Sequence, residues 1–142
     1  MPKLIVLRGL PGSGKSVYAA QQVMKGFKRV SVDELRTMLD NNRQTNDSES
    51  FAIDVMQAVV VNSLAAGYDT IIDSTNFDRY IAKFSRVIAK EYKAALEFVD
   101  IDTPLATCIA RDLNRDSGRV GKNTIMAMYS EFFINGKFPE VP

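Results

Sequence analysis

Four residues near the amino terminus have the types and spacing that suit phosphate chemistry. The pattern G-x-x-x-x-G-K-S/T is met in full by Gly9, Gly14, Lys15 and Ser16. Glycines let consecutive backbone N–H groups turn inward into an anion-binding nest, and a following helix adds the positive end of its dipole. The lysine can reach the β- and γ-phosphates of a nucleoside triphosphate, and the serine hydroxyl can bind Mg²⁺. The motif therefore predicts binding of a nucleoside triphosphate such as ATP.

A second candidate pair, Asp33 and Arg36, begins the segment DELR after an expected strand. The two side chains are three residues apart and share one side of a helical turn. A carboxylate there can take the proton from an attacking hydroxyl, which typically contributes ~10²–10⁴-fold in rate. The arginine can hold an anionic group of the phosphate acceptor. A capping aspartate with a surface ion pair explains the same letters, but the nearby phosphate loop favours catalysis.

The segment DSTN, residues 73–76, follows a third expected strand. An acid such as Asp73 at a strand end beside the phosphate loop can support Mg²⁺. A polar turn that satisfies backbone groups is the alternative, and the letters favour neither interpretation. Thr75 and Asn76 are expected to line the acceptor side.

Basic residues gather between positions 111 and 122. They are Arg111, Arg115, Arg119 and Lys122. A solvated face diluted by acidic neighbours is one interpretation. The other is a mobile basic lid that neutralises charge between donor and acceptor, where a single arginine can supply ~10³–10⁵ in rate. Arg111 and Arg115 are four apart and can face the same way, and Arg115 is the favoured lid arginine.

The composition excludes several kinds of site. There is no histidine and only one cysteine, Cys108, so histidine-based triads, histidine zinc sites and internal disulfides are ruled out. The formal charge of +1 means that any polyanion site must be local. No leader or bilayer-spanning apolar run is visible, so we expect no membrane association and a cytoplasmic location. A chain of 142 residues predicts one domain over 1–142.

Strands alternate with helices along the chain. Strands are expected over residues 3–8, 27–32, 69–74 and 95–101, and helices over 16–24, 33–40, 51–67, 78–92, 104–113 and 124–133. Residues 41–50 are expected to form a loop. This order predicts an α/β fold with a small parallel sheet of about four strands flanked by helices on both faces. Ligands of such sheets bind beyond the carboxyl ends of the strands, where the candidate residues fall.

Helix boundaries are expected at particular residues. Asp33, Asp78 and Thr103 are predicted to be N-caps, the last with proline at the first helical position. Gly26 and Gly67 are predicted to end helices.

Together these segments resemble the kinase domain of phage-type 5′-polynucleotide kinases. The resemblance is carried by GLPGSGKS, SVDELR, IIDSTN, DIDTP and CIARDLNR, and it spans about residues 3–133. It implies a P-loop kinase fold with an arginine-bearing lid over about 111–122. It also implies ATP-dependent transfer of a phosphoryl group to the 5′-hydroxyl end of DNA or RNA. The family's kinase domain is often joined to a phosphatase domain, so a fused or separate phosphatase is an expected partner, and a homo-oligomer stays open. A phage protein would work in the host-cell cytoplasm.

The resemblance also implies roles by position. Asp33 would be the general base, Arg36 would hold the 3′-phosphate of the acceptor, and Arg115 would act from the lid. Expected nucleotide contacts are Gly9, Pro11, Gly12, Ser13, Gly14, Lys15, Ser16, Val17, Arg111 and Arg115. Expected acceptor contacts are Asp33, Arg36, Asp73, Thr75 and Val120, and expected Mg²⁺ ligands are Ser16 and Asp73. The family pattern Ser-Asp-Thr-Asn is replaced by residues 73–76, DSTN, which shifts the acid by one place.

Two other functions stay open at this point. A P-loop kinase for a small metabolite hydroxyl would share the loop and the lid, and the near-neutral charge favours it. Arg36 favours an acceptor that already carries phosphate. A nucleotide-gated binding module would need neither the candidate base nor the lid.

Overall fold

The structure is a computed structural model that describes residues 1–43, 45–75, 79–116 and 119–134. Its centre is a four-stranded sheet in the order β2-β3-β1-β4, with all neighbouring strands parallel. The strands are β1 (Lys3–Arg8), β2 (Lys28–Val30), β3 (Thr70–Ile72) and β4 (Ala95–Asp100). The α/β prediction with a small parallel sheet is therefore confirmed. The predicted Asn76 and Asp78 positions lie outside the described residues.

The central strand β1 is buried on both faces. Leu4 and Val6 join a cluster with residues of α2 (Val32–Asp40), α3 (Asn46–Ala65) and α4 (Arg79–Glu91), whereas Ile5 and Leu7 pack with Ala19 of α1 (Lys15–Met24). Successive side chains of a strand point to opposite faces, so a strand covered on both sides is a continuous apolar run. Burial on both faces therefore explains the continuous apolar run LIVL at residues 4–7 of β1.

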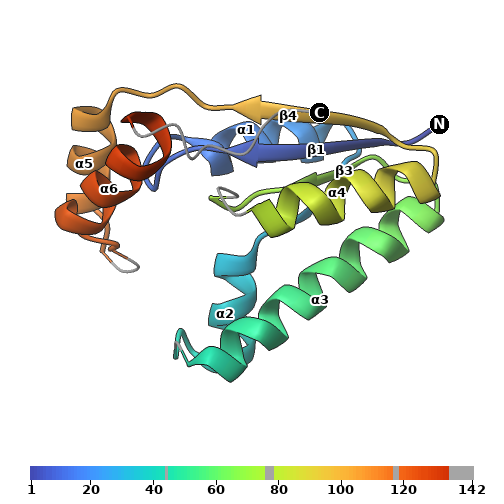
Figure 1. Cartoon of the computed structure of the whole chain (residues 1–142), viewed down its shortest axis with the longest axis horizontal. Coiled ribbons are helices and arrows are strands. Elements are labelled where there is room, and N and C mark those ends of the chain that lie inside the picture. The colour runs from blue at the N-terminus through green and yellow to red at the C-terminus, as the bar shows by residue number, and fades with distance from the viewer. Residues whose placement is uncertain (44, 76–78, 117–118, 135–142) are drawn as a thin grey trace.

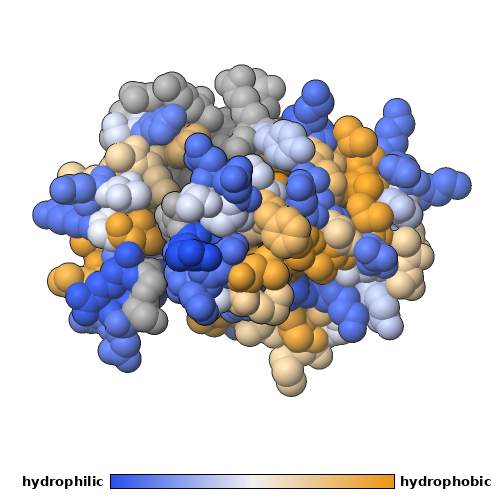
Figure 2. All heavy atoms as spheres, turned by 90° about the horizontal axis from the view of Figure 1, so that it is seen from below, coloured by the Kyte–Doolittle hydropathy of each residue, from blue (hydrophilic) through white to orange (hydrophobic). Residues whose placement is uncertain are grey.

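The helices cover both faces of the sheet and one end of it. They are α1 (Lys15–Met24), α2 (Val32–Asp40), α3 (Asn46–Ala65), α4 (Arg79–Glu91), α5 (Leu105–Leu113) and α6 (Lys122–Tyr129), followed by a π-helical turn, η1 (Ser130–Ile134). Figure 1 shows α1 on one side of the sheet and α3 and α4 on the other, with α5 and α6 beyond the carboxyl end of β1. Figure 2 views the α3 side, where hydrophobic residues reach the surface among hydrophilic ones.

The start of α2 differs from the prediction. The N-cap is Ser31, whose hydroxyl accepts a hydrogen bond from the Glu34 N–H at 3.4 Å, and Asp33 lies inside the first turn. Ser31 has the extended backbone that an N-cap needs, and its hydroxyl is a good capping group. The prediction that Asp33 caps this helix is wrong, and its carboxylate pairs with Arg36 instead.

The loop expected over residues 41–50 is also wrong in its second half. Helix α3 begins at Asn46 with a capping box, in which Thr45 and Ser48 satisfy each other's backbone N–H groups. The polar letters that indicated a loop are the capping box and an acidic first turn, which suits the helix dipole. This early start brings Glu49 of α3 against α2.

Of the other predicted helix boundaries, two are confirmed and one is wrong. Gly26 and Gly67 follow α1 and α3 with φ of 101° and 86°, which confirms both as helix stops. The prediction for Thr103 is wrong, because Pro104 holds the N-cap position of α5. The Thr103 hydroxyl donates to the carbonyl of Ser13 at 2.6 Å.

Candidate active site

The loop between β1 and α1 has a backbone that only glycine adopts without strain. Gly12 and Gly14 have φ of 81° and 99°, in the left-handed region. A Cβ on Gly12 would lie 2.5 Å from the carbonyl oxygen of Cys108 in α5. The loop thus combines a tight turn with a close approach to a neighbouring helix.

Several donors hold the carbonyl groups of this loop. Thr103 binds the Ser13 carbonyl, and Nη1 of Arg111 donates to the Gly12 carbonyl at 3.3 Å. Nζ of Lys15 donates to the carbonyls of Gly9 and Leu10 at 3.2 and 3.1 Å. The buried Oγ of Ser13 has no hydrogen-bond partner among the described residues. A nucleotide phosphate in the cradle would fit that orphaned hydroxyl, since buried polar groups are almost always hydrogen-bonded.

The amine of Lys15 is buried beside two acids. Burial lowers its pKa from the ordinary value, and the carboxylates of Asp73 and Asp33 oppose that lowering. The side chain is only 9% exposed. Both acids therefore act electrostatically on the lysine of the loop, although they lie 18 and 58 positions from it in the sequence. A cation in this position is matched to a polyanionic ligand such as a triphosphate.

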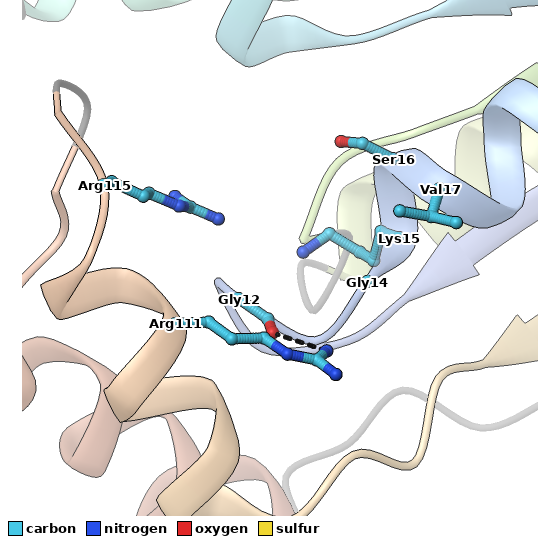
Figure 3. Close-up of a pocket in the computed structure, with 7 residues that line it drawn as sticks. All are labelled: Gly12, Gly14, Lys15, Ser16, Val17, Arg111 and Arg115. Carbon is cyan, nitrogen blue, oxygen red and sulfur yellow. Dashed lines mark hydrogen bonds between the residues drawn. The ribbon is translucent and has the colours of Figure 1, made fainter.

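A cavity of about 440 Å³ opens between this loop and two lid arginines, Arg111 in α5 and Arg115 just beyond its end. Its lining is Gly12, Gly14, Lys15, Ser16, Val17, Arg111 and Arg115. In Figure 3 the guanidinium of Arg115 points across the cavity toward Lys15, and Arg111 reaches under the loop to Gly12. The structure thus brings together most of the residues predicted to contact nucleotide. Gly9, Pro11 and Ser13 are in the same loop but do not line the cavity.

The candidate base Asp33 and its partner Arg36 belong to a three-residue network. Nη1 of Arg36 donates to Asp33, while Nε and Nη2 donate to Glu49 at 2.5 and 2.9 Å. The Glu49 hydrogen bond raises the pKa of Arg36 despite burial, and Arg36 lowers the pKa of Glu49. Asp33 is 64% exposed, so its carboxylate is open to a substrate. The sequence prediction missed Glu49 because the segment that carries it was expected to be loop.

The second acid, Asp73, is buried and engaged by Arg29 of β2. Nε and Nη2 of Arg29 lie 2.8 and 2.6 Å from Oδ2 of Asp73, and the same guanidinium pairs with Glu34. The sequence analysis did not single out Arg29. A basic residue one place before the end of β2, the strand that adjoins β3, was the available signal. Thr75 follows Asp73 and is half-buried.

The lid segment is anchored by Asp112, a buried acid of α5. Its two oxygens accept from the N–H groups of Val120 and Gly121, both at 2.9 Å. Burial raises the pKa of Asp112, but these bonds and the nearby Arg115 and Arg119 outweigh it, so the pKa is lowered overall. Val120, an expected acceptor contact, is therefore fixed through its backbone. Sequence reasoning treated Asp112 as a diluting surface charge, and its burial is visible only in the structure.

The site has few protein ligands for a metal. No group of three or more His, Cys, Asp or Glu residues in the described part of the chain is placed to hold an ion. Mg²⁺ in nucleotide sites is typically bound by one or two protein groups, several waters and the substrate phosphates. Ser16 at the cavity and Asp73 near Lys15 suit such a site. None of the helices in the described part of the chain has the length and apolar character needed to cross a membrane.

Known structures share this fold. A chain in the structure of the Pnkp1/Rnl/Hen1 complex is 27% identical, with 84% of this chain and 41% of that chain covered and a TM-score of 0.69. A chain in the Pnkp1/Rnl/Hen1 RNA repair complex is 24% identical, covering 99% of this chain and 48% of that one, with a TM-score of 0.81. The chain thus spans less than half of the length of these two relatives.

A second kind of kinase is also similar. The APS kinase CysC of Mycobacterium tuberculosis, in complex with AMPPNP and APS, is 20% identical. The match covers 80% of this chain and 69% of that one, with a TM-score of 0.63. At this identity the likeness shows the fold alone.

A family model described as an AAA domain matches residues 4–133, which is nearly all of the described structure. The match includes the glycine loop, the candidate base and the lid arginines. The chain therefore belongs to this AAA domain family and is a P-loop kinase domain that resembles polynucleotide kinases.

Proposed function

We propose that this domain transfers the γ-phosphoryl group of ATP to the 5′-hydroxyl end of a polynucleotide. The observation that carries the proposal is the position of the Asp33–Arg36 pair. Asp33 forms an ion pair with Arg36, and its carboxylate acts electrostatically on the buried Lys15 by opposing the burial that lowers the pKa of that lysine. A base paired with an anion-binding guanidinium, within electrostatic reach of the phosphate-loop lysine, supports the proposal.

On the donor side, the loop amides and Lys15 would hold the β- and γ-phosphates. Arg115 points into the cavity, and Arg111 is tied to the loop carbonyl of Gly12. Bound Mg²⁺, held by Ser16 with support from Asp73, would neutralise charge on the phosphates. Pre-positioned cations of this kind stabilise charge that develops in the transition state and need no reorganisation during the reaction.

On the acceptor side, the Asp33 carboxylate would take the proton of the 5′-hydroxyl. The oxygen would attack the γ-phosphorus as its bond to the β-phosphate oxygen breaks, and ADP would leave. Arg36 would hold the phosphate on the 3′ side of the terminal nucleotide. Glu49 accepts from Nε and from one N–H of Nη2, and Asp33 accepts from one N–H of Nη1. An acceptor phosphate would bind the N–H groups of Nη1 and Nη2 that remain.

A panel of acceptors tests the proposal. Labelled γ-phosphate from ATP is offered to 5′-hydroxyl oligonucleotides of DNA and RNA, to nucleoside 3′-phosphates and to small alcohols. We expect transfer to the 5′-hydroxyl acceptors, with a preference for those that carry a 3′-phosphate. Transfer restricted to small alcohols would contradict the proposal, as would ATP binding without transfer to any acceptor.

The hydroxyl of a small metabolite is the second candidate acceptor. One observation favours it: two acids, Asp33 and Glu49, already surround Arg36, which makes the acceptor wall less cationic than a polyanion would prefer. The APS kinase likeness shows that the same fold accommodates such chemistry in another protein. The acceptor panel separates the two.

A further inference from the structure

Helix α4 carries basic residues in a single line. Lys83, Arg86 and Lys90 are all exposed, and their spacing of three and four residues puts them on one side of the helix. The opposite side is buried by Ile81, Ser85 and Ile88. We call Lys83, Arg86 and Lys90 the α4 basic stripe.

The charge of this stripe is not compensated locally. None of its three side chains forms an ion pair with another described residue, and Glu91 is the one carboxylate in α4. A surface that serves only solubility usually mixes both signs of charge. Here the whole chain carries a formal charge of +1, so three adjacent cations are a local concentration of charge.

The stripe leads away from the proposed acceptor site. Helix α4 begins four positions after Thr75, at the carboxyl edge of the sheet where Asp73 and Asp33 lie. Figure 1 shows that α4 starts at the carboxyl end of the strands, near α2, and runs along the sheet toward the amino-terminal end of the strands. A chain whose 5′ end sits at Asp33 can therefore continue along α4.

We propose that the α4 basic stripe binds the phosphodiester backbone of the polynucleotide acceptor, beyond the nucleotide that is phosphorylated. This proposal rests on the proposed function. Lys83 and Lys90 are about 10 Å apart along the axis, from a rise of 1.5 Å per residue. That length covers two or more successive phosphates of one strand, which are about 3.4 Å apart along the axis even in a stacked duplex.

The prediction is that longer acceptors gain affinity from the stripe and short ones do not. A nucleoside 3′-phosphate ends before α4, whereas a ten-nucleotide acceptor reaches it. Each phosphate neutralised by a cation on a single strand contributes about 0.7 to the slope of log affinity against log salt. Removal of two cations should therefore lower the slope by about 1.4. A fivefold rise in salt then costs the unaltered protein about tenfold more affinity than the variant.

The experiment compares two matched double variants. Lys83→Gln/Lys90→Gln alters the stripe, and Lys25→Gln/Lys28→Gln removes the same number of positive charges from exposed positions at the end of α1 and the start of β2. Binding of a ten-nucleotide 5′-hydroxyl oligonucleotide is followed by fluorescence anisotropy at several salt concentrations. Phosphoryl transfer is measured in parallel with two acceptors, the ten-nucleotide oligonucleotide and a nucleoside 3′-phosphate. We expect the stripe variant alone to lose ten-mer affinity and salt slope, with transfer to the short acceptor unchanged.

The outcomes separate this proposal from the function on which it rests. Transfer to nucleic acid with equal salt slopes in both variants would overturn the stripe and keep the function. Stripe-dependent binding without transfer would support the stripe and overturn the function. Absence of both binding and transfer would overturn both.

Discussion

The close approach of the phosphate loop to α5 makes a sharp prediction for Gly12. Gly12 and Gly67 have nearly the same backbone, with φ of 81° and 86°. An alanine at either position adopts the left-handed region at a cost of about 1–2 kcal/mol. Around Gly67 an added Cβ meets nothing within 4 Å, whereas at Gly12 it meets the Cys108 carbonyl oxygen at 2.5 Å. Gly67→Ala is therefore a matched control for the backbone cost alone.

The magnitude follows from that difference. A contact of 2.5 Å with a backbone atom forces the loop or α5 to move, and overpacking of this kind typically costs 1–3 kcal/mol. Gly12→Ala should lower the free energy of unfolding by about 2–5 kcal/mol, compared with about 1–2 kcal/mol for Gly67→Ala. Because the shift falls on the anion nest, Gly12→Ala should also weaken ATP binding at least tenfold, and Gly67→Ala should leave it unchanged.

Urea unfolding and calorimetric ATP titration measure the two effects. The slope of the unfolding free energy against urea should stay the same in both variants, so that midpoints compare stability directly. Equal midpoints for the two alanine variants would refute the reasoning, and so would normal ATP affinity in a folded Gly12→Ala protein.

Three further changes test the contacts of the site. Glu49→Gln should slow transfer to 3′-phosphorylated acceptors by about threefold to tenfold and leave the KM for ATP unchanged, because it weakens the charge-assisted hydrogen bond that orients Arg36. Faster transfer would contradict this and show that Glu49 competes with the acceptor phosphate for Arg36. Asp112 has a pKa below its ordinary 3.8, so its stabilisation is present above that pH and is lost as pH falls through the folded value. Urea midpoints of the unaltered protein and Asp112→Asn should therefore differ at pH 7 and begin to converge only as the pH falls below 3.8, and a constant difference would contradict this. Thr103→Val removes the donor to the Ser13 carbonyl and should cost about 1 kcal/mol in thermal unfolding; no loss would mean that this bond does not hold the loop.

The parallel sheet and the phosphate loop were predictable from local letters. The apolar run of β1, the glycines and the lysine each have one physical explanation, and all of them lie within residues 3–16. Gly26 and Gly67 were predictable for the same reason, since glycine after an amphipathic run commonly ends a helix.

The predictions that were wrong depend on contacts between distant segments. Asp33 and Thr103 are plausible caps by type, but Ser31 has the better geometry and Thr103 reaches the Ser13 carbonyl across 90 positions. Glu49 became recognisable only when α3 was seen to begin at Asn46 and pack on α2. Asp112 resembles a surface acid in the sequence because its two backbone partners come from a turn that follows α5.

The central claim is that Asp33 takes the proton from the acceptor hydroxyl. The most direct test is the single-turnover rate of phosphoryl transfer to a 5′-hydroxyl oligonucleotide in Asp33→Asn, with Asp47→Asn in the first turn of α3 as the matched control. We expect Asp33→Asn to lose about 10²–10⁴-fold in rate while binding ATP normally, and Asp47→Asn to keep the rate of the unaltered protein. A folded Asp33→Asn protein that transfers phosphate at the rate of its control would contradict the account.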